Sequence, residues 1–275
     1  MSKIKDNKPL NYQGLSKNIS VIIKGGGDVA SGVAYNLYKA KIKVLILEKD
    51  NPLAVRRKVS FAQAVIDGKT TIEGVTSIFA NNYKKVEQIL SDNNIPVITD
   101  TLSSAINFFK PNVVIDATIA KKNFGLTKEI APFVIALGPG FEAGKDADIV
   151  IETNRGENLG KIIRKGFASA NTGIPATVMG YTKERVLRSP KSGIIKNIFD
   201  IGDYVKKGDI ICYVDNAEVK APFNGVIRGL IMNNRQVFIG LKIGDVNPES
   251  DKQTCYTISD KAHIIGKAAL KAIGG

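Results

Sequence analysis

Residue types that commonly bind metals or form disulfide bonds are scarce in this sequence. Its 275 residues include one histidine, His263, and two cysteines, Cys212 and Cys255. A histidine-rich metal site is therefore excluded, and the two cysteines are not at metal-ligand spacing. A disulfide framework is not expected either, which fits a reducing compartment. His263 falls in a predicted helix, where a packing role is more common than catalysis, and no neighbouring base marks either cysteine as a nucleophile.

Long apolar segments are missing as well. No stretch approaches the roughly 18 uninterrupted apolar residues of a membrane span, although an apolar content of 44% supports a packed core. Residues 1–17 are polar and lack the apolar centre of a signal peptide. We therefore expect a flexible tail there, a cytoplasmic location and no contact with a membrane.

The charge is strongly one-sided, with a net value of +13. The basic residues are spread along the chain in short groups, such as residues 56–58, 121–122 and 206–207, and no aromatic residues interleave with them. No nucleic-acid motif is present, so nucleic acid is not the favoured partner. A cationic surface could instead attract an anionic small molecule or an acidic protein, or could simply be a solvated, lysine-rich surface.

One stretch, residues 20–32, predicts a strand, a tight glycine turn and a helix. Its spacing is G-x-G-x-x-A, the dinucleotide-binding fingerprint with alanine in the third position. Gly25 permits the sharp turn, Gly27 allows a ligand to approach the backbone, and Ala30 lets the helix pack closely. The N–H groups of Gly26, Gly27 and the helix start would bind a phosphate.

The context of this turn supports a nucleotide site. A second apolar run over residues 44–47 ends in Glu48, about 20 positions after Gly27, near the spacing of the acid that binds a ribose hydroxyl. Two observations point the other way. A glycine turn can merely join a strand to a helix, and Asp28 at the helix start could cap the helix and would repel a phosphate.

Strands and helices alternate through the first two thirds of the chain. Strands are predicted near residues 96–100, 113–116, 133–137 and 149–152, with helices over 81–92 and 101–109. This alternation indicates a parallel sheet, in which ligands bind beyond the carboxyl ends of the strands. The further candidate ligand-binding residues just after strands are Asp116, Thr118, Asn154 and Arg155. Each could equally belong to an ordinary strand end or surface turn.

Near residue 185 the pattern changes to short glycine-punctuated strands with an internal repeat. Equivalent residues lie 32 positions apart, among them Pro190 and Pro222, Gly193 and Gly225, and Val205 and Val237. The phrases G-D-Y-V-K-K-G-D-I (202 to 210) and A-P-F-N-G-V-I (221 to 227) resemble the barrel-sandwich hybrid of biotinyl and lipoyl carriers. The linking segment, residues 214–220, lacks the hallmark neighbours of a modified lysine, so a docking or structural module is the better interpretation.

We therefore predict an α/β protein with a Rossmann-like parallel-sheet domain, a small all-β barrel-sandwich-hybrid (biotinyl/lipoyl-like) domain and a C-terminal helix. The expected segments are a flexible tail over 1–17, the nucleotide-binding domain over 18–184, the barrel-sandwich domain over 185–250, and a C-terminal strand and helix over 251–275. Ser259 can cap that last helix.

Several phrases together resemble one family across nearly the whole chain. They are I-I-K-G-G-G-D-V-A-S-G-V-A (22 to 34), R-R-K-V-S-F-A-Q-A-V (56 to 65), A-L-G-P-G-F-E-A-G (136 to 144), I-E-T-N-R-G-E-N-L-G (151 to 160), A-N-T-G-I-P (170 to 175) and I-S-D-K-A (258 to 262). The chain resembles the accessory protein of the selenium-dependent molybdenum hydroxylase system, the YqeB family. The resemblance implies a cytoplasmic factor in the maturation of a molybdenum hydroxylase, partnering the hydroxylase or its cofactor-maturation proteins, and transfers no catalytic residues.

Three functions remain open at this point. The first is a maturation factor that binds a nucleotide-bearing cofactor, either NAD(P) or the cytosine dinucleotide form of the molybdenum cofactor, a molybdopterin dinucleotide. The second is an NAD(P)-dependent oxidoreductase, although the spaced pair Tyr35 and Lys39 lies in the first helix rather than beside a strand end. The third is a docking chaperone with a vestigial nucleotide site. Whether the chain is an enzyme does not follow from the sequence.

Overall fold

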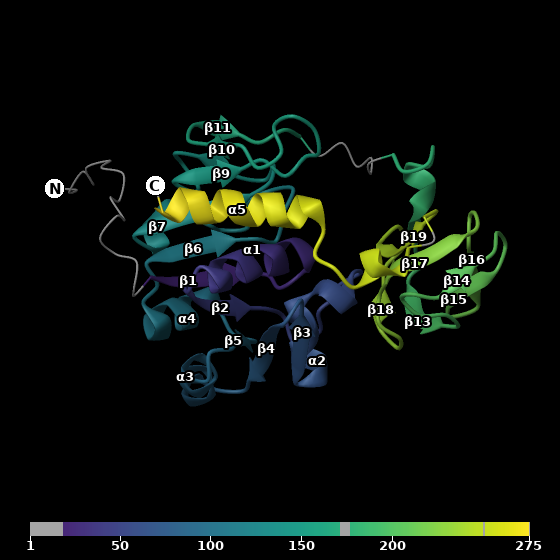
Figure 1. The fold of residues 1–275 in the computed structure, drawn as a ribbon, viewed down its shortest axis with the longest axis horizontal. Coiled ribbons are helices and arrows are strands. Elements are labelled where there is room, and N and C mark those ends of the chain that lie inside the picture. Colours follow the sequence, from purple (N-terminus) through teal and green to yellow (C-terminus); the bar gives the residue numbers. More distant parts are fainter. Residues whose placement is uncertain (1–18, 171–176, 250, 275) are drawn as a thin grey trace.

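The computed structural model describes residues 19–170, 177–249 and 251–274 (Figure 1). The predicted flexible tail, residues 1–17, lies outside the described residues. Figure 1 shows an α/β part on the left and a β-rich part on the right, with helix α5 (Asp260–Gly274) lying along the α/β part. The start of α5 points toward the β-rich part.

The α/β part is built on one nine-stranded sheet. In spatial order its strands are β10 (Ile162–Ile163), β9 (Ile149–Ile151), β7 (Phe133–Leu137), β6 (Val113–Asp116), β1 (Ser20–Lys24), β2 (Lys43–Leu47), β5 (Ile95–Ile98), β4 (Val75–Ala80) and β3 (Lys69–Ile72). The prediction of a parallel sheet is wrong, because β3 pairs antiparallel with β4 and β10 with β9. Both exceptions are edge strands reached by short connections, which do not allow the crossover that a parallel pair needs.

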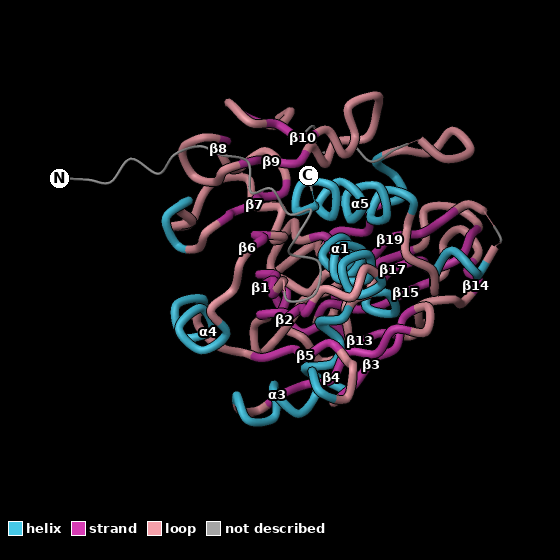
Figure 2. Tube along the Cα trace, turned by 60° about the vertical axis from the view of Figure 1, so that its left-hand side comes forward, coloured by secondary structure: helices cyan, strands magenta, loops and turns pink. Residues whose placement is uncertain are grey.

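The alternation of side chains along the central strands divides the apolar core into two layers. Val21 and Ile23 of β1 face one layer with α1 (Asp28–Lys39) and α5, and Ile22 faces the other layer. That second layer contains α3 (Tyr83–Ser91) and α4 (Leu102–Phe109). Figure 2 shows α1 and α5 on one side of the strands and α4 on the other. The strands are thus buried on both faces, as their continuous apolar runs indicate.

Helices α1 and α5 pack against each other unusually closely. A Cβ added to Gly32 would lie 2.6 Å from the Cβ of Ala262, and one added to Gly266 would lie 2.5 Å from the carbonyl oxygen of Gly32. Asn36 also donates from Nδ2 to that carbonyl oxygen at 2.7 Å. The predicted cap of α5 is confirmed, since the N–H of Ala262 donates to Ser259 Oγ at 3.2 Å. Small residues therefore hold the C-terminal helix on the first helix.

The β-rich part consists of two four-stranded sheets, and neighbouring strands in both sheets pair antiparallel. One contains β12 (Val186–Arg188), β19 (Lys242–Asn247), β17 (Gly225–Leu230) and β14 (Tyr204–Val205); the other contains β16 (Ala217–Lys220), β15 (Ile210–Val214), β13 (Gly193–Asn197) and β18 (Gln236–Val237). The 32-residue repeat is confirmed in the strands, because β13 and β17, β14 and β18, and β15 and β19 each begin 32 positions apart. Members of each pair lie in opposite sheets.

The prediction of a biotinyl/lipoyl-like barrel-sandwich domain is wrong. The β-rich part contains β12 in addition to the repeat, and this strand pairs with β19. It also joins the α/β part directly, since the N–H of Leu230 donates to the carbonyl of Val55 at 2.8 Å and the guanidinium of Arg57 pairs with Asp200. The repeat predicts the spacing of strands and turns correctly, but many β folds share such a spacing, so it does not identify the family of the domain. The predicted segment boundaries themselves stay a prediction.

The remaining elements are short. They are α2 (Ala64–Asp67), the two-stranded pair β8 (Glu142–Ala143) and β11 (Gly166–Phe167), and the 3-10 helices η2 (Arg57–Val59), η3 (Phe61–Gln63), η4 (Lys128–Ile130), η5 (Lys183–Arg185) and η6 (Lys252–Cys255). Among the described residues 251–274 the predicted C-terminal strand is not formed; this segment instead begins with η6, which Asp251 caps and whose Cys255 is buried in the β-rich core. Within the described part of the chain, no helix has the length and apolar character to cross a membrane.

The close contact between α1 and α5 predicts that Gly32→Val is destabilising. Its side chain would overlap the backbone of Ala262, where an added Cβ already lies 2.8 Å from the carbonyl carbon, so we expect a loss of about 1–3 kcal/mol in the free energy of unfolding. Urea denaturation measures it. Gly274→Val is the control, because a Cβ there meets nothing within 4 Å. Equal stability of the two variants would contradict the close packing.

Candidate functional site

The first two glycines of the turn after β1 serve the fold. Gly25 has φ +96°, a conformation that favours glycine, and its N–H donates to the carbonyl of Leu47 at 2.8 Å. A Cβ on Gly26 would lie 2.9 Å from the backbone nitrogen of Ala62. Substitution at either position therefore strains the protein itself.

Gly27 differs from its two neighbours. Its φ is −65°, which any residue adopts, and a Cβ placed on it would meet nothing within 4 Å. It precedes α1, where no side chain caps the helix start, so the first N–H groups remain available to an anion. The protein does not require glycine at this position, whereas a ligand approaching the backbone would.

These N–H groups open into a cavity of about 340 Å³, here called the glycine-turn cavity. It lies at the carboxyl ends of β1, β2 and β6, and its lining includes Gly27, Val29, Ala30, Glu48 and Thr118. The chain passes from β1 to β2 on one side and returns to β6 on the other, so the cavity sits where the strand order reverses. Ligands of open α/β sheets bind at such a point.

Glu48 lies in this cavity as the sequence predicts, and the backbone holds its carboxylate. Oε2 accepts the N–H of Gly26 at 2.7 Å and Oε1 accepts the N–H of Lys49 at 2.8 Å. Each carboxylate oxygen keeps a further lone pair for a ligand hydroxyl. The acid is therefore positioned by the same turn that would bind the phosphate.

Asp116, by contrast, does not line the glycine-turn cavity. It is buried, and its Oδ2 accepts from Lys24 Nζ at 3.0 Å while its Oδ1 accepts from Thr118 Oγ1 at 2.5 Å. It therefore positions Thr118, which does line the glycine-turn cavity. The next residue, Ile119, has φ +52°, a rare conformation for a β-branched side chain.

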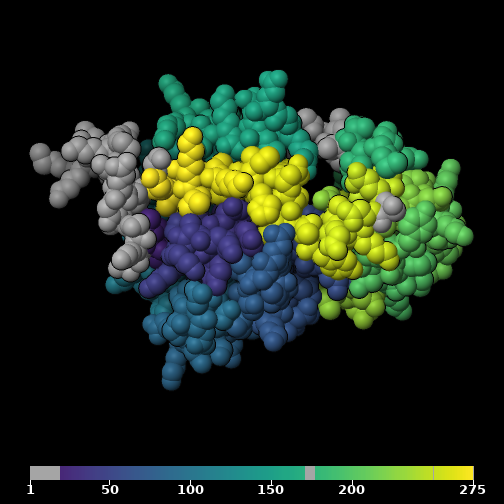
Figure 3. All heavy atoms as spheres, in the orientation of Figure 1, coloured from purple at the N-terminus to yellow at the C-terminus, as the bar shows by residue number. Residues whose placement is uncertain are grey.

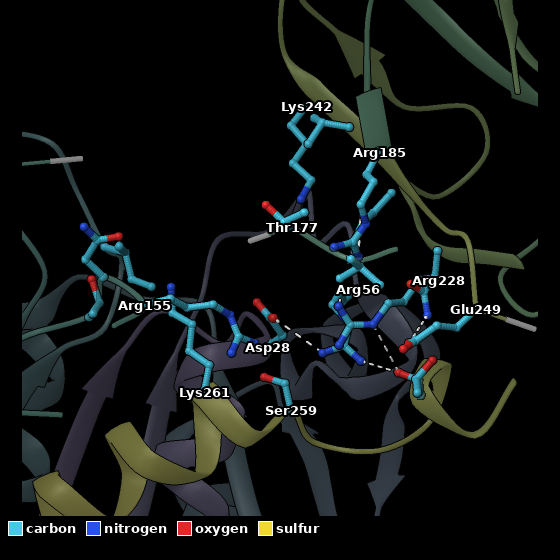
Figure 4. A pocket seen from close by; sticks show the side chains of 18 of the residues that line it. Asp28, Arg56, Arg155, Thr177, Arg185, Arg228, Lys242, Glu249, Ser259 and Lys261 are labelled. Carbon is cyan, nitrogen blue, oxygen red and sulfur yellow. Dashed lines mark hydrogen bonds and ion pairs between the residues drawn. The ribbon is translucent and has the colours of Figure 1, made fainter. Parts of the chain in front are cut away.

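A second and larger cavity, of about 580 Å³, lies between the α/β part and the β-rich part; we call it the arginine cavity. Its cationic lining residues are Arg56, Arg155, Arg185, Arg188, Arg228, Lys242 and Lys261, and its acidic ones are Asp28, Asp245 and Glu249. Figure 4 shows Arg155 and Lys261 reaching it from one side and Arg185, Arg228 and Lys242 from the other. In the space-filling view the surface is hollowed beside the start of α5 (Figure 3). Asp28 and Ile119 line both cavities.

Asn154 and Arg155 follow β9, as predicted, but both are engaged within the protein. Arg155 donates two 2.9 Å hydrogen bonds to the carboxylate of Asp260. This pairing raises the pKa of Arg155 and lowers that of Asp260 to about 2. The N–H of Asn154 donates to Glu152 Oε1 at 2.7 Å.

The structure thus divides the predicted site residues. Gly25, Gly27, Asp28, Ala30, Glu48 and Thr118 line the glycine-turn cavity, whereas Asn154 and Arg155 line the arginine cavity together with Asp28. Gly26 and Asp116 line neither cavity. Gly26 donates its N–H to Glu48, and Asp116 accepts a hydrogen bond from Thr118.

Sequence reasoning missed most of the arginine cavity. Arg56 was visible only as one of a basic run, and no spacing links it to Arg185, Arg228 or Lys261. Among the described residues, no group of three or more His, Cys, Asp or Glu side chains could hold a metal ion.

The comparisons with known proteins give one clear relative. No family model matches the sequence. The chain is 46% identical over 253 residues to the uncharacterized protein YqeB of Escherichia coli (strain K12), which confirms the resemblance to YqeB. The match covers 92% of this chain and 47% of that protein, so the chain spans about half the length of the curated relative it matches.

Similar solved structures share little with the chain. An aspartoacylase family protein from Mesorhizobium loti is 13% identical with a TM-score of 0.27, over 86% of this chain and 88% of that one. A succinylglutamate desuccinylase/aspartoacylase from Rhodobacter sphaeroides is also 13% identical with a TM-score of 0.27, over 84% and 86%. Scores this low carry no argument about activity.

Buried Glu152 generates a pH-dependent prediction. Burial raises the pKa of its carboxyl, but the backbone N–H groups of Asn154 and Ser169, which donate to it at 2.7 Å each, outweigh this and hold the pKa below the usual 4.5. Glu152→Gln should therefore lose about 1–3 kcal/mol of unfolding free energy at pH 7. The stabilisation is complete above pH 4.5 and is lost as the pH falls through the lower folded value.

Urea denaturation at neutral and acidic pH measures this difference. Glu157→Gln is the matched control, because Glu157 is exposed and lies on the same loop. A Glu152→Gln deficit that stays constant down to the acid limit would contradict the assignment.

Proposed function

We propose that the chain is a cytoplasmic accessory factor in the maturation of a molybdenum hydroxylase of the selenium-dependent type, and that it binds a nucleotide-bearing cofactor in the glycine-turn cavity. The observation that carries the binding proposal is Gly27, the one glycine of the turn that the fold does not need. The maturation role rests on the resemblance to the YqeB family.

The geometry supports a phosphate at the start of α1. The uncapped helix start supplies free N–H groups and the positive end of the helix dipole. Glu48 lines the same cavity beside the turn, where it could accept a ribose hydroxyl. A dinucleotide would fit this pairing, and the candidates are NAD(P) and a molybdopterin dinucleotide.

An NAD(P)-dependent oxidoreductase would use the same turn, because Glu48 suits the ribose of a nicotinamide dinucleotide. The two functions differ in what happens to the ligand. A maturation factor would hand the bound cofactor on unchanged, whereas an oxidoreductase would change the absorbance of the nicotinamide at each turnover. Spectrophotometry of purified protein with NADH or NADPH and a substrate panel separates them.

The decisive variant is Gly27→Val. Its side chain would project into the glycine-turn cavity and displace the phosphate, so we expect at least a tenfold loss of affinity, about 1.4 kcal/mol. The fold should lose no more than about 1 kcal/mol, the scale of a helix-cap change. Mass spectrometry of small molecules released from the gently purified protein identifies the ligand, and calorimetry with that ligand measures the affinity.

Gly274→Val is the matched control, because it makes the same change at another open position. In cells that lack the chain, Gly27→Val should also fail to restore the client hydroxylase activity that the wild type restores. Unchanged ligand affinity in a folded Gly27→Val protein would refute the binding site. Full restoration by a variant that binds no ligand would leave a docking chaperone as the function.

A further inference from the structure

We propose that the arginine cavity is a second ligand site, which binds a phosphorylated small molecule through a doubly charged phosphate or diphosphate group. The site goes beyond the proposed function, because it uses a different cavity and different side chains from the glycine turn. It is formed jointly by the α/β part, through Arg56 and Lys261, and by the β-rich part, through Arg228 and Lys242.

The lining of the arginine cavity carries an excess of positive charge. Seven cationic side chains line the cavity against three acidic ones. Asp260 does not line the cavity but forms an ion pair with Arg155. Even when Asp260 is added to the three acidic lining residues, seven cations face four carboxylates. A dianion would bring the local charge closer to neutrality.

Two arginines of the cavity are largely covered yet have no close ion pair. Arg56 is only 8% exposed, and the nearest carboxylate oxygen, on Asp28, lies 3.8 Å from its Nη1. Arg228 likewise stands 3.9 Å from Asp245. Burial, and then repulsion from Arg228, lowers the pKa of Arg56. Arg56 is buried and Arg228 is mostly covered, and at these distances from a carboxylate both are weakly compensated. Each would gain from a charge-assisted hydrogen bond.

The hydrogen bonds of Arg56 point the same way. Its Nη2 donates to the carbonyl oxygens of Thr254, at 2.8 Å, and Thr257, at 3.2 Å. These neutral acceptors fix the guanidinium at the cavity wall without cancelling its charge. Its buried Nε has no hydrogen-bond partner among the described residues.

A third, independent observation concerns Asn247, which also lines the cavity. This side chain is 2% exposed, and its Oδ1 has no hydrogen-bond partner in the described part of the chain, while its Nδ2 donates to Glu249 at 3.1 Å. A buried acceptor of this kind calls for a donor. The ligand should therefore place a hydrogen-bond donor, such as a hydroxyl or amine group, beside its phosphate.

Isothermal titration calorimetry on the full chain tests the site with two probes, inorganic pyrophosphate and ribose 5-phosphate, at constant ionic strength. We expect saturable binding of both at one site. The double variant R228Q/K242Q should weaken both probes at least tenfold. Asn247→Ala should weaken ribose 5-phosphate several-fold and pyrophosphate less, because the sugar supplies several hydroxyl donors and hydrogen pyrophosphate only one.

The controls separate a site from a generally cationic surface. R164Q/K196Q removes the same charge from two exposed side chains outside the cavity and should bind both probes as the wild type does. Lys242→Gln alone changes an exposed residue, so it remains folded and should still weaken pyrophosphate binding measurably. No binding of either probe, or equal weakening by the cavity and control pairs, would overturn the proposal.

Gly27→Val keeps the two proposals distinguishable. It should leave pyrophosphate binding to the arginine cavity unchanged. Pyrophosphate binding without any nucleotide binding would refute the glycine-turn site alone. Nucleotide binding with no response to either anionic probe would refute the arginine cavity alone.

Discussion

The contact between α1 and α5 is the constraint on which both cavities depend. Because Gly32, Ala262 and Gly266 let the two helices meet backbone to backbone, the start of α5 is fixed beside the start of α1. Asp28 and Lys261, at those two starts, consequently line the same cavity. The segment leading into α5 is fixed with it, and its carbonyl groups hold Arg56. A helix at the far end of the chain thus completes a site that begins at the first strand.

Placing guanidinium groups between two parts of a protein has an energetic consequence. Apolar side chains there would stabilise the contact by burial alone, whereas buried charges require compensation that the carboxylates at 3.8–3.9 Å supply only in part. Other direct links between the parts lie outside the cavity, in the pairing of Arg57 with Asp200 and in the backbone bond from Leu230 to Val55. Within the lining, Arg56 also joins the parts through the carbonyl of Thr254. The contact between the parts therefore does not depend on the cationic lining alone, which leaves those charges available for a role in binding.

What the sequence predicted well is local. The strand, turn and helix over residues 20–32, the acid at the end of β2 and the 32-residue repeat each depend on neighbouring residues or on a short period, and the structure contains them. Non-local features escaped. The antiparallel edges of the sheet depend on the path of the chain between β3 and β4 and between β9 and β10. The arginine cavity brings together Arg56, Arg228 and Lys261, which are separated by between 33 and 205 positions in the sequence. Asp116 shows the limit within a correct pattern: it ends a strand as expected, yet Lys24 and Thr118 occupy its carboxylate.

Asp28 is where local and non-local information meet. Read locally, a carboxylate at the start of α1 opposes a phosphate there. In the fold, the nearest cation to Asp28 is Arg56, brought from another segment to 3.8 Å, and the two stand in the arginine cavity. The negative charge is thereby partly offset, although Asp28 also lines the glycine-turn cavity with Gly27, Val29 and Ala30. The local objection to an anion at the helix start is therefore weakened, because a cation from another segment partly compensates the opposing charge.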